Sequence, residues 1–310
     1  MDTDDGTFST GGMIGLWTKA DAQTHFDDLA AHAARPIIDP SVVSLAIGVE
    51  AKEAEDGTVR AVWPRTDVLV TVDGMAFTPP AGLTTWAAFA ADDGRSMVMG
   101  DVVVFQDEVS PAMDAAFAHR LEITALHNHF FFDEPKVYFM HIAGRGDTGR
   151  LAAGVKAVWD AVRAVRRASP VPASRFPGQI PSTGSIDADR IGTILGYSAT
   201  TSAGVVKVSI GRTATMAGVT FGGSMGLSTW AAFSGSDALA AVDGDFAMTA
   251  AEVQPVLRTL RKAGIHIVAL HNHMIGENPA YFFTHFWGTG PAADLARGIR
   301  AALDAQGSGT

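Results

Sequence analysis

Runs of alternating and helically spaced apolar residues predict a regular succession of short elements. Residues 67–72 are rich in β-branched side chains and are followed by an Asp-Gly turn signal, so they predict a strand. Segments 86–90 and 96–105 predict two further strands. From Ser110 to Leu121 the apolar residues recur at helical spacing, and we expect Ser110 to cap this helix, with a proline in its first turn.

The chain that follows predicts a hairpin and a long helix. Strands are expected at Ile123–Phe130 and Val137–Ile142, with a turn at Asp133–Lys136 between them, and a helix is expected at 149–168. Strands outnumber helices, and several neighbouring strands form hairpins. This pattern is typical of an α+β fold with a mainly antiparallel sheet and helices packed on it.

The same pattern occurs twice, 144 residues apart. Trp86 and its neighbours reappear around Trp230, the pair Gly100-Asp101 reappears at 244–245, and the block Ala125-Leu-His-Asn-His129 reappears at 269–273. A register kept without a gap over about eighty positions indicates an internal duplication. We therefore expect two tandem domains of one fold, related by a pseudo-twofold axis.

A proline-rich stretch separates the two copies, with prolines at 170, 172, 177 and 181. Such a stretch, without an apolar period, is typical of a linker. The predicted organisation is an N-terminal helical extension over 1–36, a first repeat domain over 37–168, a linker over 169–184 and a second repeat domain over 185–310.

Composition and charge exclude several classes of function. A chain of 310 residues with 47% hydrophobic residues can fill two cores. The net charge of −10 argues against nucleic acid and anionic membranes as partners, and the absence of cysteine excludes thiolate ligands and disulfides. No apolar run approaches the roughly 18 residues of a membrane span, and no signal peptide precedes the first domain, so we expect a cytoplasmic protein.

Each copy carries a His-Asn-His pair followed by a third histidine. Alternate residues of a strand share a face, so His127 and His129 are expected on one side of the hairpin. A turn centred on Pro135 would place His141 opposite His129, with Cβ atoms about 5 Å apart. The second copy repeats this pattern with His271, His273 and His285.

Three imidazoles on one face predict a metal site with an open coordination position. We expect a divalent transition metal, with zinc, iron, manganese and copper as the candidates. Glu134 and Glu277 follow the histidine pairs and are candidate catalytic carboxylates, although the 144-residue spacing pairs Asp133 with Glu277. The alternative is a purely structural polar cluster, which is disfavoured because crowded buried imidazoles without a metal lack partners.

Two pairs of repeated acids are weaker signals. Asp101 and Asp245 each follow a glycine before an apolar strand, and Glu108 and Glu252 each lie just before a helix. The glutamates are expected to compensate charge at the helix N-termini. A contact with the histidines is the alternative for them.

With these residues in view, the chain is similar to the LppY/LpqO family, a domain of unknown function named after mycobacterial lipoproteins. The resemblance covers about 37–165 and 185–305, and the second copy departs from it at Arg212-Thr213-Ala214. It implies no activity, and the lipidated cysteine of the named members is absent. The residues that carry the resemblance are Arg65-Thr66-Asp67, Gly100-Asp101, Ala125–His129, Pro135, His141, Gly144 and Gly146.

Two functions follow from the histidine clusters. The first is a metal-dependent enzyme acting on a small, largely apolar or carbonyl-bearing substrate by hydrolytic, lyase, isomerase or oxygen chemistry. The second is a non-catalytic metal- or ligand-binding protein. An open coordination position in a concave pocket would favour the enzyme. We expect both clusters to bind metal and the second to be more accessible, because Gly276 stands where the first has Phe132.

Overall fold

The computed structural model describes residues 38–307, so the helical extension predicted over 1–36 lies outside the described residues. Among the described helices none is long and apolar enough to cross a membrane. The α-helices are α1 Pro40–Ile47, α2 Val109–Ala118, α3 Thr148–Ala168, α4 Ala188–Leu195, α5 Ala250–Lys262 and α6 Ala292–Gln306, with short 3₁₀ turns η1 Pro79–Ala81 and η2 Gly223–Met225.

One twelve-stranded sheet runs through both repeats in the order β1-β2-β5-β6-β9-β7-β16-β17-β15-β14-β11-β10. Every pairing in it is antiparallel. The strands of the first repeat are β1 Ala51–Glu53, β2 Val59–Pro64, β5 Thr84–Asp92, β6 Arg95–Phe105, β7 Glu122–His127 and β9 Val137–Gly146. Those of the second are β10 Ala199–Ser202, β11 Val205–Gly211, β14 Ser228–Gly235, β15 Ala240–Met248, β16 His266–His271 and β17 Phe282–Gly290.

The strand order of the sheet is symmetric about its central pair, β7 and β16. Read from either edge inward, the two repeats have the same strand order, and Leu126 of β7 is the Cα partner of its equivalent Leu270 of β16. Pairing of one residue with its own equivalent on an antiparallel strand is what a pseudo-twofold requires. The predicted α+β fold with an internal duplication is confirmed.

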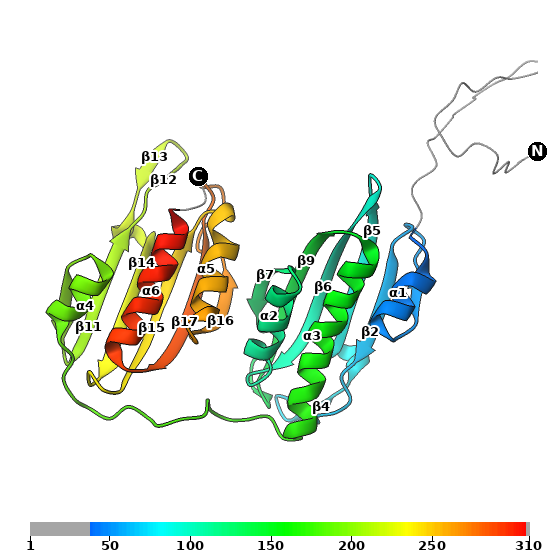
Figure 1. Ribbon diagram of the computed structural model, residues 1–310, viewed down its shortest axis with the longest axis horizontal. Helices are drawn as coiled ribbons and strands as arrows, with labels where there is room; N and C mark the ends of the chain where they lie inside the picture. Colours follow the sequence, from blue (N-terminus) through cyan, green and yellow to red (C-terminus); the bar gives the residue numbers. More distant parts are fainter. Residues whose placement is uncertain (1–37, 308–310) are drawn as a thin grey trace, which may run out of the picture. The chain divides into compact units, whose positions relative to one another are not determined.

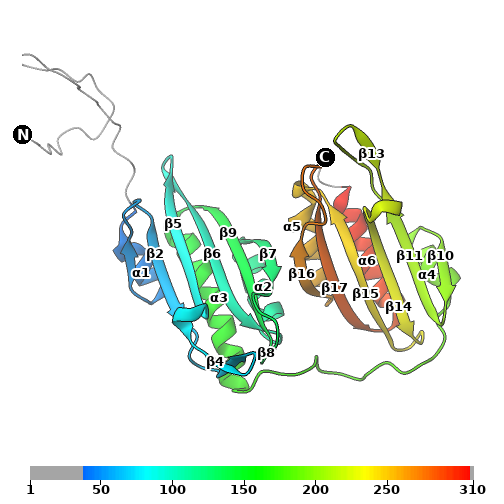
Figure 2. The same ribbon diagram turned by 180° about the vertical axis from the view of Figure 1, so that it is seen from behind.

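Within residues 38–307, the helices of each repeat lie on one face of the sheet, as Figures 1 and 2 show from opposite sides. Apolar residues alternate along β5, where Ala87 and Phe89 are fully buried, and recur at helical spacing along α3, where Val155, Trp159 and Val162 are buried. The main core therefore lies between the sheet and its helices.

A smaller apolar cluster lies on the opposite face of the sheet in each repeat. In β9 the successive residues Phe139 and Met140 are both buried, but Phe139 belongs to the small cluster and Met140 to the main core. Short strands outside the large sheet adjoin these clusters: β3 Val70–Val72, β4 Met75–Phe77, β8 Asp133–Glu134, β12 Ala214–Met216 and β13 Val219–Phe221.

The repeated glutamates lie at the starts of α2 and α5, but only Glu252 bonds to the helix N-terminus, whereas the Glu108 side chain makes no cap hydrogen bond. Glu108 is buried at the N-cap of α2, where Oε2 accepts hydrogen bonds from Arg65 Nη1 at 2.9 Å and from the Phe105 amide at 2.9 Å. Glu252 forms a capping box with Thr249 and an ion pair with Arg212 at 3.0 Å. Ser110 is not the cap, because α2 begins one residue earlier.

Two side chains in the middle of α5 bond directly to the first repeat. The side-chain amide of Gln254 exchanges two hydrogen bonds with the backbone of Ile123, at 3.1 and 2.7 Å. Arg258 donates to the carbonyls of Phe117 and Leu121, both at 2.9 Å, which close the C-terminal end of α2. The stretch between α3 and α4, which contains the predicted linker, has neither helix nor strand in the described structure.

Candidate metal centre

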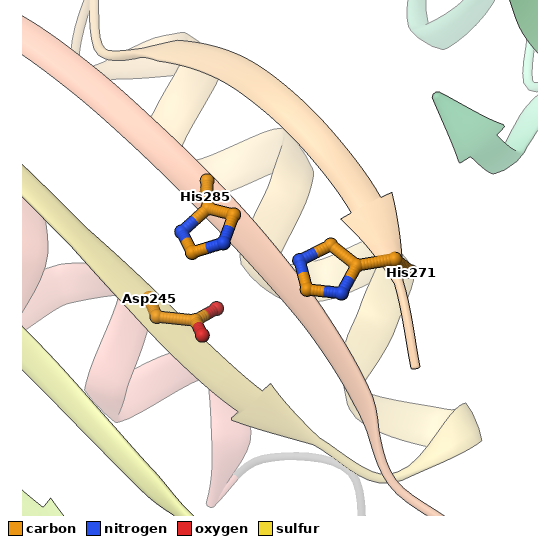
Figure 3. Close-up of side chains that lie close together, drawn as sticks. All are labelled: Asp245, His271 and His285. Atoms are coloured by element: carbon orange, nitrogen blue, oxygen red, sulfur yellow. The ribbon is translucent and has the colours of Figure 1, made fainter. Parts of the chain in front are cut away.

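Three neighbouring strands of the second repeat bring an acid and two histidines together. Asp245 of β15 is the Cα partner of His285 on β17, and His285 is the partner of Ala269 on β16, two residues before His271. One ligand atom from each of Asp245, His271 and His285 lies within 4.8 Å of the others. Figure 3 shows the carboxylate and the two rings directed toward a common space.

The glycine before the acid allows this close arrangement. A Cβ atom at Gly244 would lie well inside van der Waals contact of the Trp230 carbonyl oxygen and the Phe286 ring. A glycine therefore lets the strands on both sides and the Phe286 ring pack against β15. At the equivalent Gly100, a Cβ would lie 2.9 Å from the Trp86 carbonyl oxygen. The repeated Gly-Asp pair is thus a packing requirement that also places the acid.

Hydrogen bonds to the backbone orient the two rings. Nδ1 of His285 lies 3.3 Å from the Gly244 carbonyl oxygen, and Nδ1 of His271 lies 3.3 Å from the Asn272 carbonyl oxygen. An N–H at Nδ1 donates to these carbonyls, which leaves the Nε2 lone pair of each ring available. This is the arrangement by which metal-binding histidines are held in proteins.

Buried polar atoms in this group lack partners. Asp245 is 1% exposed, and within the described residues neither its Oδ1 nor Nε2 of His271 has a hydrogen-bond partner. Burial raises the pKa of Asp245, while the charges of His285, His273 and His271 act to lower it. A buried carboxylate whose negative charge is not fully balanced destabilises the folded protein, and a bound cation would remove this destabilisation. The residues present therefore fit a divalent metal.

The equivalent residues of the first repeat share the same strand register, but among the described residues only the group of the second repeat has all three ligand atoms within 4.8 Å of one another. Asp101 of β6 is the Cα partner of His141 on β9, and His141 Nε2 lies 3.9 Å from Asp101 Oδ1 and 3.0 Å from His127 Nε2. Oδ1 of Asp101 has no hydrogen-bond partner in the described part of the chain. Burial raises the pKa of Asp101, and the charges of His141, His129 and His127 oppose this shift.

The remaining histidine of each cluster lies beside the set. The ring of His129 stacks on Phe139 with centroids 3.4 Å apart, and that of His273 stacks on Phe283 at 3.5 Å. His273 Nε2 also lies 3.3 Å from Asp245 Oδ2. Burial lowers the pKa of both His129 and His273. In each repeat the aspartate thus lies beside two histidines, at the place where the sequence pattern predicted the third histidine.

The predicted pairing of His141 with His129 is wrong. In the observed register His141 pairs with Ala125 and His127 with Phe139, and a bulge interrupts β7 between Ile123 and Ala125. The second repeat has the same register, with His285 opposite Ala269. The strand ends at His127, and the chain then forms a wide loop whose β8 segment pairs with β3 instead of closing a tight hairpin.

The two candidate catalytic glutamates lie in these loops. Glu134 is exposed and is paired with Thr71 of β3. Glu277 is buried, and its Oε1 accepts a hydrogen bond from the Tyr281 amide at 2.8 Å. Asp133 accepts in the same way from the Val137 amide at 2.7 Å. Asp133 and Glu277 are therefore equivalent loop-bracing carboxylates, and the catalytic role of Glu134 and Glu277 stays a prediction.

In the sequence, Asp101 and Asp245 stand out as repeated acids, but the spacing of the histidines did not predict that they join the metal site. A signal was available, because each is an acid at the same place in both copies and is followed by a buried apolar run, Val102–Phe105 in the first repeat. A carboxylate at such a position needs a charged or hydrogen-bonding partner.

Among the solved structures that match the chain are proteins named as microcompartment shell proteins. EtuB from Clostridium kluyveri is 10% identical, with 83% of this chain and 90% of that chain covered and a TM-score of 0.22. The trimeric shell protein PduB is 11% identical, with 82% and 89% covered and a TM-score of 0.20. The double-ringed trimeric shell protein MSM0271 from the RMM microcompartment is 13% identical, with 71% and 85% covered and a TM-score of 0.20.

These comparisons correct the functional prediction. Three of the matched structures are named as microcompartment shell proteins, which does not agree with the predicted metal-dependent enzyme and its small-molecule substrate. The prediction of an enzyme with a small-molecule substrate is at odds with these names and is not proposed again. No curated protein matches the chain.

The family resemblance is also corrected. The family model that matches is not LppY/LpqO; it carries the description Domain of Unknown Function (DUF1259) and matches residues 41–161 and 189–305. The two matched segments coincide with the two repeats of the sheet and together span most of the chain. The chain therefore belongs to the Domain of Unknown Function (DUF1259) family, with two tandem copies of its domain.

Proposed function

We propose that the protein binds one divalent transition-metal ion in each repeat, without catalysis, through Asp101, His127 and His141 in the first and Asp245, His271 and His285 in the second. This proposal rests on the second repeat, where one ligand atom from each of the three residues lies within 4.8 Å of the other two. In the described part of the chain, Asp245 Oδ1 and His271 Nε2 are buried and have no hydrogen-bond partner. Zinc, iron, manganese and copper remain the candidates.

The donor set narrows the chemistry of the ion. Two imidazoles and one carboxylate suit borderline cations such as Zn²⁺, Fe²⁺ and Mn²⁺ and lack the thiolates that favour Cu⁺. In each repeat the three ligands come from three adjacent strands, so a bound ion would join these strands on the face opposite the described helices. Its role would be to stabilise the sheet and to offset the burial of the acid.

The test is the metal content of protein purified without an affinity tag, after removal of metal with a chelator and titration with Zn²⁺ by calorimetry. We expect about two ions per chain. Asp245→Asn and Asp101→Asn should each remove one. Asp243→Asn is the matched control, because Asp243 is an exposed acid of the same strand, and it should retain both ions.

The outcomes separate the alternatives. Loss of all metal in either variant would mean one shared site and would contradict two independent centres. Unchanged stoichiometry in Asp245→Asn, or no saturable uptake by the parent protein, would refute the proposal. His273→Ala should retain the ion with about ten- to a hundredfold weaker affinity, as expected for a residue that contacts a ligand without being one.

A further inference from the structure

A cavity of about 760 Å³ lies away from both metal centres. Its walls come from the start of α2, the end of α5, strands β16 and β17, and the segment 173–181 that joins the repeats. This volume is within the range of pockets that enclose a small organic ligand. The metal ligands proposed above are not among its lining residues.

Most of the accessible surface of the wall is apolar, although about half of the lining residues are polar. The ring of Phe176 stacks on the imidazole of His266 with centroids 3.8 Å apart and planes 13° apart. Trp287, the Cα partner of His266 on β17, also lines the cavity, together with Val268. Phe176 thus lies flat on the His266 ring, and Trp287 lines the same cavity.

The charged side chains that line the cavity form ion pairs, with one exception. Arg261 and Asp114 form an ion pair at 2.8 Å, and Asp107 is paired with Arg166. Arg175 lines the cavity and has no ion pair within the described residues. His266 Nδ1 lies 2.8 Å from Ser110 Oγ, and burial together with Arg261 lowers the pKa of His266 to about 4, so the ring is neutral at pH 7.

We infer that this cavity binds a planar aromatic molecule that carries one negative charge, such as an aromatic carboxylate. The outer face of Phe176 and the ring of Trp287 offer stacking surfaces, while His266 supports Phe176 from behind. The aliphatic residues exclude water from the ring edge, and Arg175 supplies the single uncompensated positive charge among the described lining residues. A second anionic group on the ligand would meet Asp107 or Asp114 and would be disfavoured.

The test uses the full chain and 2-naphthoate as the probe, with binding measured by calorimetry and ligand-observed NMR. The protein is first treated with a chelator, so that the carboxylate cannot bind through a metal. We expect one saturable site per chain. The neutral analogue 2-naphthylmethanol should bind at least about threefold more weakly, because it lacks the charge that Arg175 attracts.

Variants locate the site. Val268→Trp fills the cavity from a side chain that is 39% exposed, and it should abolish saturable binding without disturbing the core. Phe176→Ala should weaken binding about three- to tenfold through the loss of one stacking partner. Phe131→Ala, which removes an equally large ring that is 79% exposed and outside the cavity, is the matched control and should bind as the parent does.

Three outcomes would overturn the inference: no saturable binding of 2-naphthoate, binding that Val268→Trp and Phe176→Ala leave unchanged, or binding that is lost equally in Phe131→Ala. If Val268→Trp fails to fold, Phe176→Ala decides, because Phe176 belongs to the segment between the repeats and not to either core.

Discussion

At the scale of the residue, a buried acid changes the meaning of the histidine pattern. Three histidines per copy suggested a site made of imidazoles alone, but Asp245 lies opposite His285 in the register, while the ring of His273 stacks on Phe283. Burial raises the pKa of the Asp245 carboxyl group, and the charges of the neighbouring histidines only partly oppose this shift. An acidic residue that lies in a predicted strand and precedes a buried apolar run should therefore be treated as a candidate ligand, as the nearby histidines are.

His266 predicts a pH dependence of stability. Its pKa is about 4 in the folded protein, lowered by burial and by Arg261 against the opposing charge of Asp114, whereas the unfolded value is about 6.5. Between pH 6.5 and 4 the unfolded chain binds a proton that the folded chain resists, so stability falls as pH decreases through this window. Because the residue is partly exposed to solvent, we expect a loss of about 1 kcal/mol.

The measurement compares thermal unfolding of the parent protein and His266→Gln at pH 7 and pH 5. The parent should lose more stability between these pH values than the variant, since glutamine does not titrate. His119→Gln, at an exposed position, serves as the control and should behave as the parent does. An identical pH response in parent and His266→Gln would show that the ring titrates normally.

At the scale of the element, the loop between β7 and β9 shows where hairpin reasoning failed. A symmetric turn was inferred around Pro135, but the pairs Ala125–His141 and His127–Phe139 place the centre of the pairing earlier, and Asp133 braces the end of the loop through the Val137 amide. The strand identities were nevertheless predictable, because they follow from the local alternation of apolar residues.

The glycines before the acids predict unequal effects of the same substitution. In Gly244→Ala the new methyl group would overlap the Trp230 carbonyl and the Phe286 ring, whereas in Gly100→Ala the nearest atom lies at 2.9 Å. We expect Gly244→Ala to cost about 1–3 kcal/mol, and Gly100→Ala to cost less. Urea unfolding of the two variants measures this, and equal losses would contradict the packing difference between the repeats.

At the scale of the whole molecule, α5 attaches the second repeat to the first. Gln254 completes the hydrogen bonds of Ile123, and Arg258 satisfies two carbonyls at the C-terminal end of α2. The residues of the first repeat that are equivalent to Gln254 and Arg258 are Ser110 and Asp114. These two bond instead to His266 and Arg261 of the second repeat. The duplicated domains have thus diverged where they meet.

We therefore predict that Gln254→Ala and Arg258→Ala increase amide hydrogen exchange over residues 117–127, because each substitution removes partners from buried backbone groups at about 1–3 kcal/mol. Arg300→Ala is the matched control: Arg300 donates to the Leu195 carbonyl within the second repeat, so faster exchange should be confined to the region of α4. Unchanged exchange over 117–127 in both test variants would show that these bonds do not hold the junction.

Local periodicity and internal repetition were enough to establish the duplication, the α+β class, most strands and helices, and the grouping of His127 with His141 and of His271 with His285. These properties depend on spacing along the chain, which a sequence states directly. The tertiary structure decided which acid joins each histidine pair, which histidine stands aside, how α5 meets β7, and where the cavity beside His266 forms. Each of these depends on register and contact between segments distant in sequence, and a shift of one residue in a strand moves a side chain to the opposite face.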